Sequence, residues 1–111
     1  MRLLQPWAAD ADPNIRRFAC EATRPHGVWC APVPALKSEP WRALPLLEPL
    51  LSDPSLYVRN SVANWLNDAS RTRPEWVQEV CVQWQRRSRT PETAYITRRA
   101  LRTIRRSAPA G

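Results

Sequence analysis

Glu21 is the first side chain of this sequence that could do chemistry. It lies four residues after Arg17 and three before Arg24, so both guanidinium groups fall beside its carboxylate on a helix. A carboxylate kept ionised by cations can stabilise a cationic transition state or orient a water molecule. The plainer interpretation is a surface ion pair, worth about 0.3–0.5 kcal/mol. The residues alone leave both interpretations open.

Asp68 is the second candidate. It follows Ser61 by seven residues and Asn64 by four, which places the three side chains on one polar edge of a helix. The same chemistry is open to this carboxylate. The alternative is that Asp68 ends its helix or pairs with an arginine, and the residue types by themselves favour that structural role.

The C-terminal part of the chain is strongly basic. Residues 1–70 carry seven basic and seven acidic side chains, whereas residues 71–111 carry ten arginines and three glutamates, and hence the whole net charge of +7. A surface of this kind favours a polyanion, most simply a nucleic acid backbone, and the forked guanidinium group suits phosphate. The alternative is a solvated surface from an arginine-rich proteome. The candidates for contact with the backbone are Arg17, Arg24, Arg59, Arg98, Arg99, Arg102 and Arg106.

A repeated phrase indicates the elements that position these residues. Asp12-Pro13-x-Ile15-Arg16 recurs as Asp53-Pro54 followed by Tyr57-Val58-Arg59, and a weaker copy begins at Thr90-Pro91. Arg16 and Arg59 are 43 positions apart, and a period of about 40–47 residues is typical of HEAT helix pairs. We therefore predict an all-α, right-handed HEAT-like solenoid of about two and a half repeats. In such an array the function lies on the concave face made by successive second helices.

The acidic and basic residues of this phrase have a structural interpretation. Asp12, Asp53 and Thr90 each precede a proline and are expected to be N-caps. Asp–Arg pairs in HEAT arrays often form a ladder between repeats. We interpret Asp12, Asp53, Arg16 and Arg59 as mainly structural, although Arg59 also stays among the backbone candidates.

Prolines at helix starts predict five helices, over residues 13–23, 40–51, 54–67, 74–87 and 91–106. Pro45 and Pro49 are expected to bend the second helix. Arg98, Arg102, Arg105 and Arg106 are expected on one face of the fifth. The apolar faces comprise Ile15, Phe18, Ala19 and Ala22; Leu44, Leu47, Leu50 and Leu51; Val58, Val62, Trp65 and Leu66; Val77, Val80, Cys81 and Trp84; and Ile96, Ala100, Leu101 and Ile104.

These helices form one expected domain over residues 1–106, with repeats at about 1–23, 40–68 and 74–106 and a disordered tail over 107–111. The first repeat is expected to lack most of its leading helix, so we interpret the chain as an internal piece of a longer solenoid. A proline-rich loop over residues 24–39 places Trp29 in its middle. A long loop that carries an aromatic residue is often functional.

Several classes of protein are disfavoured. Three cysteines without C-x-x-C spacing and a single histidine offer no standard zinc set, so we expect no metal and no other cofactor. The start is too short for a signal peptide, and no apolar run of about 18 residues exists. We expect a soluble, cytoplasmic protein with reduced thiols and no membrane partner.

Two stretches are more specific than a generic HEAT pattern. The first is IRRFACEATRP over residues 15–25, followed by Val28-Trp29 and Lys37, and the second is YVRNSVANWLND over residues 57–68. Together with the ending Ala100-Leu101-Arg102-Thr103, they resemble the DNA alkylation repair family. These proteins are HEAT-like-repeat DNA glycosylases of the AlkD/AlkC kind, and the resemblance is nearest to the AlkC branch. It covers about residues 5–106.

The resemblance implies an enzyme that binds double-stranded DNA, as a monomer when full length, and excises cationic alkylated bases of the 3-methyladenine and 3-methylcytosine class. By position, Glu21 and Asp68 match two catalytic acidic residues, and Trp29 matches an aromatic residue at the lesion. Alkylation at N3 makes the base a good leaving group, and a carboxylate beside the sugar would stabilise the oxocarbenium charge that develops there. The alternative is a non-enzymatic HEAT scaffold that binds protein or nucleic acid, in which Glu21 and Asp68 are ion-pair partners.

Overall fold

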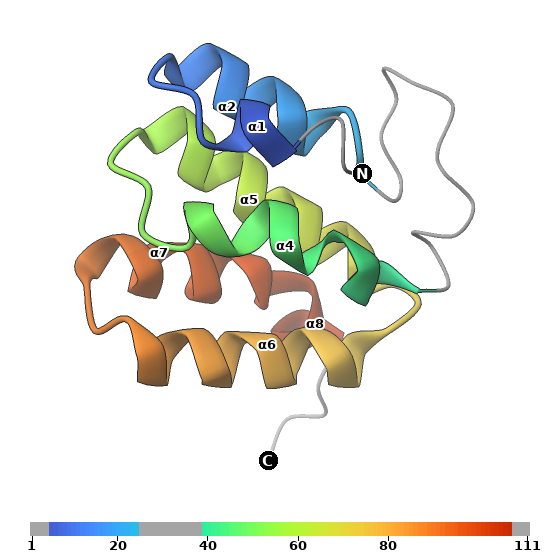
Figure 1. Ribbon diagram of the computed structural model, residues 1–111. Coiled ribbons are helices and arrows are strands. Elements are labelled where there is room, and N and C mark those ends of the chain that lie inside the picture. Colours follow the sequence, from blue (N-terminus) through green and yellow to red (C-terminus); the bar gives the residue numbers. More distant parts are fainter. Residues whose placement is uncertain (1–4, 25–38, 108–111) are drawn as a thin grey trace.

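The computed structural model describes residues 5–24 and 39–107 (Figure 1). All the regular secondary structure in these ranges is helical, which confirms the predicted all-α class. Most of the predicted loop, including Trp29 and Cys30, lies outside the described residues, as do Leu3 and Leu4 at the start of the chain. The elements are α1 (Gln5–Ala8), α2 (Pro13–Glu21), η1 (Pro40–Ala43), α4 (Leu44–Leu47), η2 (Glu48–Leu50), α5 (Leu56–Ala69), α6 (Pro74–Arg87), α7 (Pro91–Ala100) and α8 (Arg102–Ser107).

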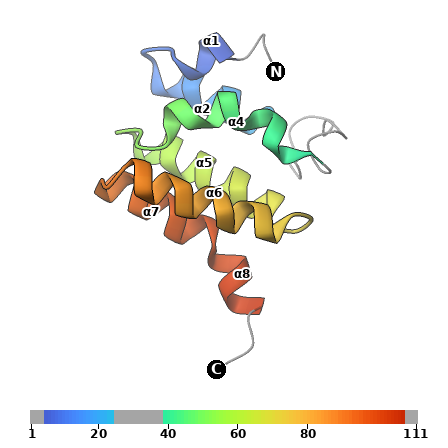
Figure 2. The same cartoon turned by 60° about the horizontal axis from the view of Figure 1, so that its bottom comes forward.

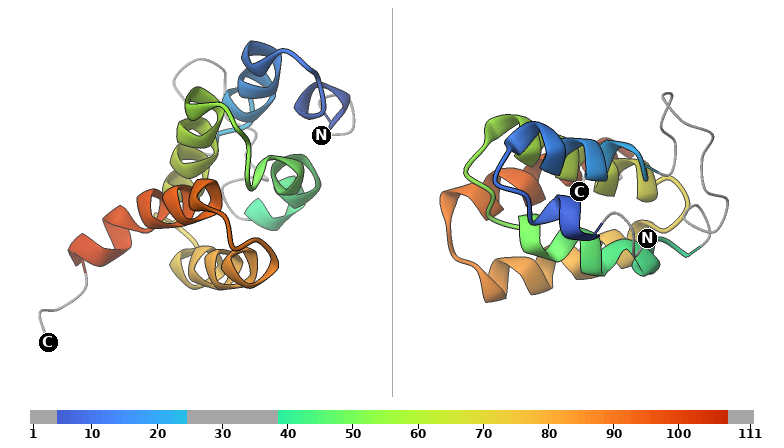
Figure 3. Two further views of the ribbon diagram at one scale, coloured as in Figure 1. Left: turned by 90° about the vertical axis from the view of Figure 1, so that its left-hand side faces the viewer. Right: turned by 45° about the horizontal axis from the view of Figure 1, so that its top comes forward.

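The helices form two columns (Figure 3). One column holds the second helices of successive pairs, so that α5 packs between α2 and α7. The other holds α1, α4 and α6. Helix α8 projects away from the end of α7 (Figure 2). Stacked helix pairs of this kind are the HEAT-like array that the repeated phrase predicts.

The core lies between the columns and is centred on α5. Its predicted stripe is fully buried, with Val58, Val62, Trp65 and Leu66 all at 0% exposure. The predicted apolar face of α6, from Val77 to Trp84, is buried as well. Burying one large apolar side chain stabilises a fold by about 1.5–3 kcal/mol, so these two helices contribute much of the packing energy. None of the described helices is long and apolar enough to cross a membrane.

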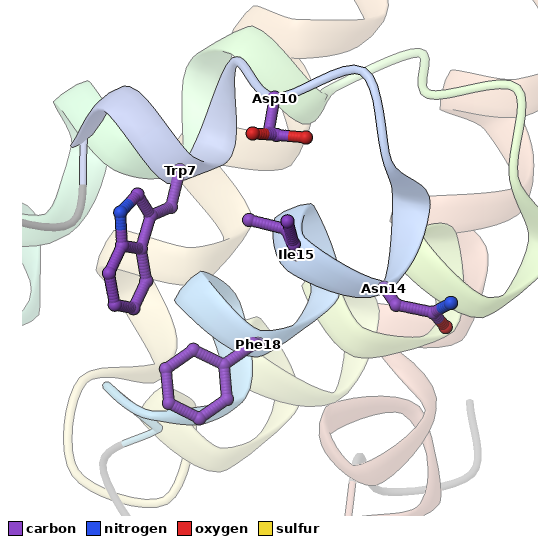
Figure 4. Close-up of a pocket in the computed structure, with 5 residues that line it drawn as sticks. All are labelled: Trp7, Asp10, Asn14, Ile15 and Phe18. Carbon is purple, nitrogen blue, oxygen red and sulfur yellow. The ribbon is translucent and has the colours of Figure 1, made fainter.

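The apolar face of α2 is divided between core and solvent. Ala19 is buried, whereas Ile15 and Phe18 are 36% and 52% exposed. Phe18 packs on Trp7 of α1, with 5.6 Å between the ring centroids. An open pocket of about 400 Å³ is lined by Trp7, Asp10, Asn14, Ile15 and Phe18 (Figure 4). The sequence pattern correctly groups Ile15 and Phe18 on one face, but that face is largely exposed.

Two predicted helices are interrupted. The second becomes the three short segments η1, α4 and η2, and a proline occupies the first or second position of each. Pro45 and Pro49 lack the N–H that a continuous helix needs, so they do more than bend it.

The fifth predicted helix breaks at Leu101, between α7 and α8. A tertiary contact lies at the break. The side-chain amide of Asn67 donates to the carbonyl oxygen of Ala100 at 3.0 Å, an acceptor that a continuous helix would offer to Ile104. The expectation of one helix over 91–106 is therefore wrong, and the four arginines do not share one continuous helix face.

A ladder contact joins the first two repeats, as predicted for Arg16 and Asp53. Nε and Nη2 of Arg16 donate to the two oxygens of the Asp53 carboxylate at 2.8 and 3.0 Å. Asp53 is not an N-cap, because Ser55 caps α5 and donates its own N–H to Asp53. Asp12 has no arginine partner in the described residues and caps α2 instead. Thr90 caps α7 as predicted.

Candidate functional site

Arg24 brings the two predicted carboxylates together. It lies just beyond the end of α2, and its Nε donates to Oδ2 of Asp68, at the end of α5, over 2.8 Å. Its Nη1 donates to Oε1 of Glu21 over 3.2 Å. Residues 44 positions apart thus form one acidic cluster, made of Glu21, Arg24 and Asp68, across the boundary between two repeats.

The polar edge of α5 supplies the neighbours of this cluster. Ser61 donates its hydroxyl to Oε2 of Glu21 at 2.6 Å, so both oxygens of Glu21 accept hydrogen bonds. Asn64 turns toward α8 and accepts a hydrogen bond from Nη2 of Arg102 at 2.9 Å. The predicted grouping of Ser61, Asn64 and Asp68 on one edge is confirmed, and the edge faces α2 on one side and α8 on the other.

The two carboxylates differ in what they leave free. Oδ2 of Asp68 is held by Arg24, whereas its Oδ1 has no hydrogen bond in the described part of the chain. The Asp68 side chain is only 7% exposed. This arrangement presents one fixed carboxylate oxygen at a nearly closed surface, which is a suitable geometry for stabilising a nearby cation.

The pKa values of the two arginines near the cluster, Arg24 and Arg102, are shifted in opposite directions. Burial lowers the pKa of Arg24, but the hydrogen bond and charge of Asp68 together with Glu21 outweigh it, and the net pKa is raised. Burial and the neighbouring Arg99 lower the pKa of Arg102. Within the described residues, Arg102 donates hydrogen bonds to two neutral oxygens, the side-chain oxygen of Asn64 and the carbonyl of Arg99. Arg102 is therefore a positioned cation that would gain from an added anion.

Trp65 and Thr23 fix the position of the chain that carries Arg24. The indole Nε1 of Trp65 donates to Oγ1 of Thr23 at 3.1 Å, and that hydroxyl lies within hydrogen-bonding distance of the carbonyls of Ala19 and Cys20. Trp65 also packs edge-on against Trp76, with 6.5 Å between centroids. Neither Trp65 nor Thr23 was predicted to support the site. The signal available was that a buried indole needs an acceptor for its N–H.

The remaining backbone candidates differ in exposure. Arg17, Arg98, Arg99 and Arg106 are exposed, and Arg17 forms no ion pair with Glu21. Arg59 is half-buried near the start of α5. Arg24 is engaged by two carboxylates, so it belongs to the acidic cluster and is not on the free basic surface. Trp29, the predicted lesion contact, lies outside the described residues.

Comparisons with known proteins agree with this architecture. The chain is 45% identical over 101 residues to the uncharacterized protein YhaZ of Bacillus subtilis (strain 168), which covers 91% of this chain and 28% of that relative. Its structure is similar to that of the Pseudomonas fluorescens alkylpurine DNA glycosylase AlkC bound to DNA containing an abasic site analog, with a TM-score of 0.86 and 38% identity. That match covers 93% of this chain and 28% of the glycosylase chain.

The chain thus spans just over a quarter of the length of both relatives. The family model described as DNA alkylation repair enzyme matches residues 1–104, which is almost the whole sequence. The chain belongs to the DNA alkylation repair enzyme family.

Proposed function

We propose that this chain carries the lesion-facing carboxylates of a DNA glycosylase that excises cationic alkylated bases of the 3-methyladenine and 3-methylcytosine class from double-stranded DNA. The observation that carries the proposal is Asp68: Arg24 holds one of its carboxylate oxygens, and among the described residues the other oxygen accepts no hydrogen bond. The similarity to an alkylpurine DNA glycosylase bound to DNA supports it.

The chemistry follows from the charge of the substrate. An alkylated base leaves as a neutral molecule, so the bond between the base and C1′ breaks with positive charge growing on the sugar. Asp68 would stabilise that charge with its free oxygen and orient the water that attacks C1′. The water proton passes to the carboxylate or to bulk solvent. Glu21 would add negative charge to the site, and Ser61 and Arg24 fix its position.

The arginines have two roles in this proposal. Arg24 positions the carboxylates. Arg102, whose acceptors among the described residues are neutral, and the exposed Arg17, Arg98, Arg99 and Arg106 would contact phosphates. From the family resemblance, Trp29 would lie against the lesion. The protein would act in the cytoplasm as a monomer, with no metal.

The test is single-turnover excision by the native full-length protein, on duplex DNA with one 3-methyladenine. Asp68→Asn keeps the shape of the side chain and removes its charge, and the loss of one preorganised group typically lowers the rate about 10²–10³-fold. Binding to undamaged duplex should hold or improve, since a negative charge is lost. Glu79→Gln is the control, because Glu79 is exposed on α6 in the other column.

A second function has some support, because both carboxylates pair with Arg24 as they would in a purely structural scaffold. A wild-type excision rate in Asp68→Asn would remove Asp68 from the chemistry. Absence of excision by the full-length wild-type protein would favour the non-enzymatic scaffold.

A further inference from the structure

Arg16 and Arg59 hold equivalent places in successive repeats. Nη1 of Arg16 donates to two carbonyl oxygens in the turn before α2, at 2.9 and 3.0 Å. Nη1 of Arg59 does the same in the turn before α5, at 3.1 and 2.8 Å. Each arginine is therefore anchored over the turn that precedes its own helix, and its Nε–Nη2 edge is left for another partner.

In Arg16 this edge binds the Asp53 carboxylate, whereas in Arg59 it binds no carboxylate of the described residues. Asp53, which pairs with Arg16, lies two residues before the N-cap of α5. The residue two before the N-cap of α7 is Ser88, an uncharged side chain whose hydroxyl bonds to Thr90 and Thr93. The ladder therefore loses its acidic member at the third repeat.

Arg59 shows the consequence. Its Nε is enclosed without a hydrogen-bond partner, the one side-chain atom of this kind in the described residues. The guanidinium lies 5.5 Å from the centroid of the Tyr95 ring. A ring face attracts a cation but cannot accept from the fork as a carboxylate does. An enclosed donor without an acceptor is costly, so this edge favours an added oxyanion.

A pocket adjoins the same arginine. It is open, has a volume of about 280 Å³, and is lined by Arg59, Pro91, Glu92, Tyr95 and Arg98. Pro91 is the first residue of α7, so the positive end of that helix dipole also lies here. Two guanidinium groups face one carboxylate, that of Glu92, and the pocket keeps an excess of positive charge.

We propose that this pocket binds one phosphate group between Arg59 and Arg98, in the place that the Asp53 carboxylate takes beside Arg16. Phosphate oxygens match the guanidinium fork. The Glu92 carboxylate lines the same pocket and repels the phosphate, so the affinity for phosphate should be low. Asp68 lies nine positions after Arg59 on α5, about 14 Å along the helix axis, so the pocket is distinct from the acidic cluster.

The first test uses inorganic phosphate, which makes it independent of the proposed function. Titration at constant ionic strength, followed by NMR of the arginine Nε–H groups, should shift Arg59 and Arg98 saturably in the millimolar range. Arg98→Gln should weaken binding about 10-fold or more. Glu92→Gln should strengthen it about 2- to 5-fold, because a like charge is removed. Arg86→Gln, exposed on α6, is the matched control and should leave the affinity unchanged.

A second variant tests the analogy with the ladder. Ser88→Asp puts a carboxylate at the position equivalent to Asp53, where it should occupy the Arg59 fork and weaken phosphate binding about 10-fold or more. The proposal would be overturned if phosphate left the Arg59 and Arg98 resonances unshifted. It would also be overturned if the single variants Glu92→Gln and Ser88→Asp both bound phosphate with the affinity of the wild type.

The source of the phosphate is decided by a separate arm. If the ligand is a DNA phosphodiester, an inference that rests on the proposed function, Arg98→Gln should reduce the salt slope of binding to undamaged duplex by about 1. Phosphate binding with an unchanged slope assigns the pocket to free phosphate. A negative phosphate titration with normal base excision overturns this inference alone, whereas loss of the Asp68 effect overturns only the proposed function.

Discussion

Replacing Arg24 by glutamine tests whether one cation holds the acidic cluster together. The bond to Asp68 joins side chains that are 22% and 7% exposed, at 2.8 Å, and a charge-assisted bond in such a setting contributes about 1.5–3 kcal/mol. The bond to Glu21, at 3.2 Å and in a more open setting, adds about 0.5–1 kcal/mol. We expect Arg24→Gln to lower the free energy of unfolding by about 2–4 kcal/mol, or the melting temperature by about 8–32 °C.

The assay is urea unfolding of the wild type, Arg24→Gln, Asp68→Asn and the double variant. The coupling energy of the two residues should be at least about 1 kcal/mol, because the partners share a direct contact. Arg42→Gln is the matched control, since Arg42 pairs with Glu39 at 3.0 Å but is 57% exposed, and its loss should cost less than about 0.5 kcal/mol. A coupling energy near zero, or equal effects of Arg24→Gln and Arg42→Gln, would refute the reasoning.

Three further outcomes are expected. Trp65→Phe keeps an aromatic ring but removes the N–H that donates to Thr23, so it should destabilise the fold by about 1–2 kcal/mol in urea unfolding. A loss of stability no larger than that of Trp76→Phe would contradict this. Burial raises the pKa of both Cys20 and Cys81 to about 12, so the native state keeps protonated thiols that ionise when unfolded. Their contribution to stability is complete below the unfolded pKa of about 9 and is lost as pH rises toward about 12, and Cys81→Ala should flatten that fall in chemical unfolding. Excision should survive treatment with EDTA, because the proposed chemistry uses carboxylates only, and abolition by the chelator with recovery on adding zinc would contradict it.

The sequence predicts the helices whose stability depends on local pattern and caps. The apolar stripe of α5 and the bounds of α6 agree with expectation because periodicity and the proline at the start of α6 act within the helix itself. The break at Leu101 coincides with a contact from Asn67, more than 30 residues away, and no local signal marks it. Contacts of this range are set by how repeats stack, which a single helix pattern does not contain.

The candidate site shows the same division. The residue types of Glu21, Ser61 and Asp68 indicate a polar site, and the structure places them together. What the spacing hides is that Arg24 joins both carboxylates, which changes it from a candidate for phosphate contact to a positioning residue. The prediction that Asp53 is an N-cap is also wrong, because Asp12 and Asp53 both precede proline although only Asp12 is an N-cap.

The acidic cluster lies across the joint between two repeats, with Glu21 and Arg24 on one side and Asp68 on the other. Each repeat of a solenoid touches only its neighbours, so the array behaves as a spring whose curvature changes by small rotations at such joints. The separation of the two carboxylates is then a mechanical variable of the array. We infer that the two ion pairs of Arg24 limit how far this separation can change. A DNA duplex bound on the concave face would strain the boundary between these two repeats. The strength of the Arg24–Asp68 ion pair would then determine how far the two carboxylates move apart.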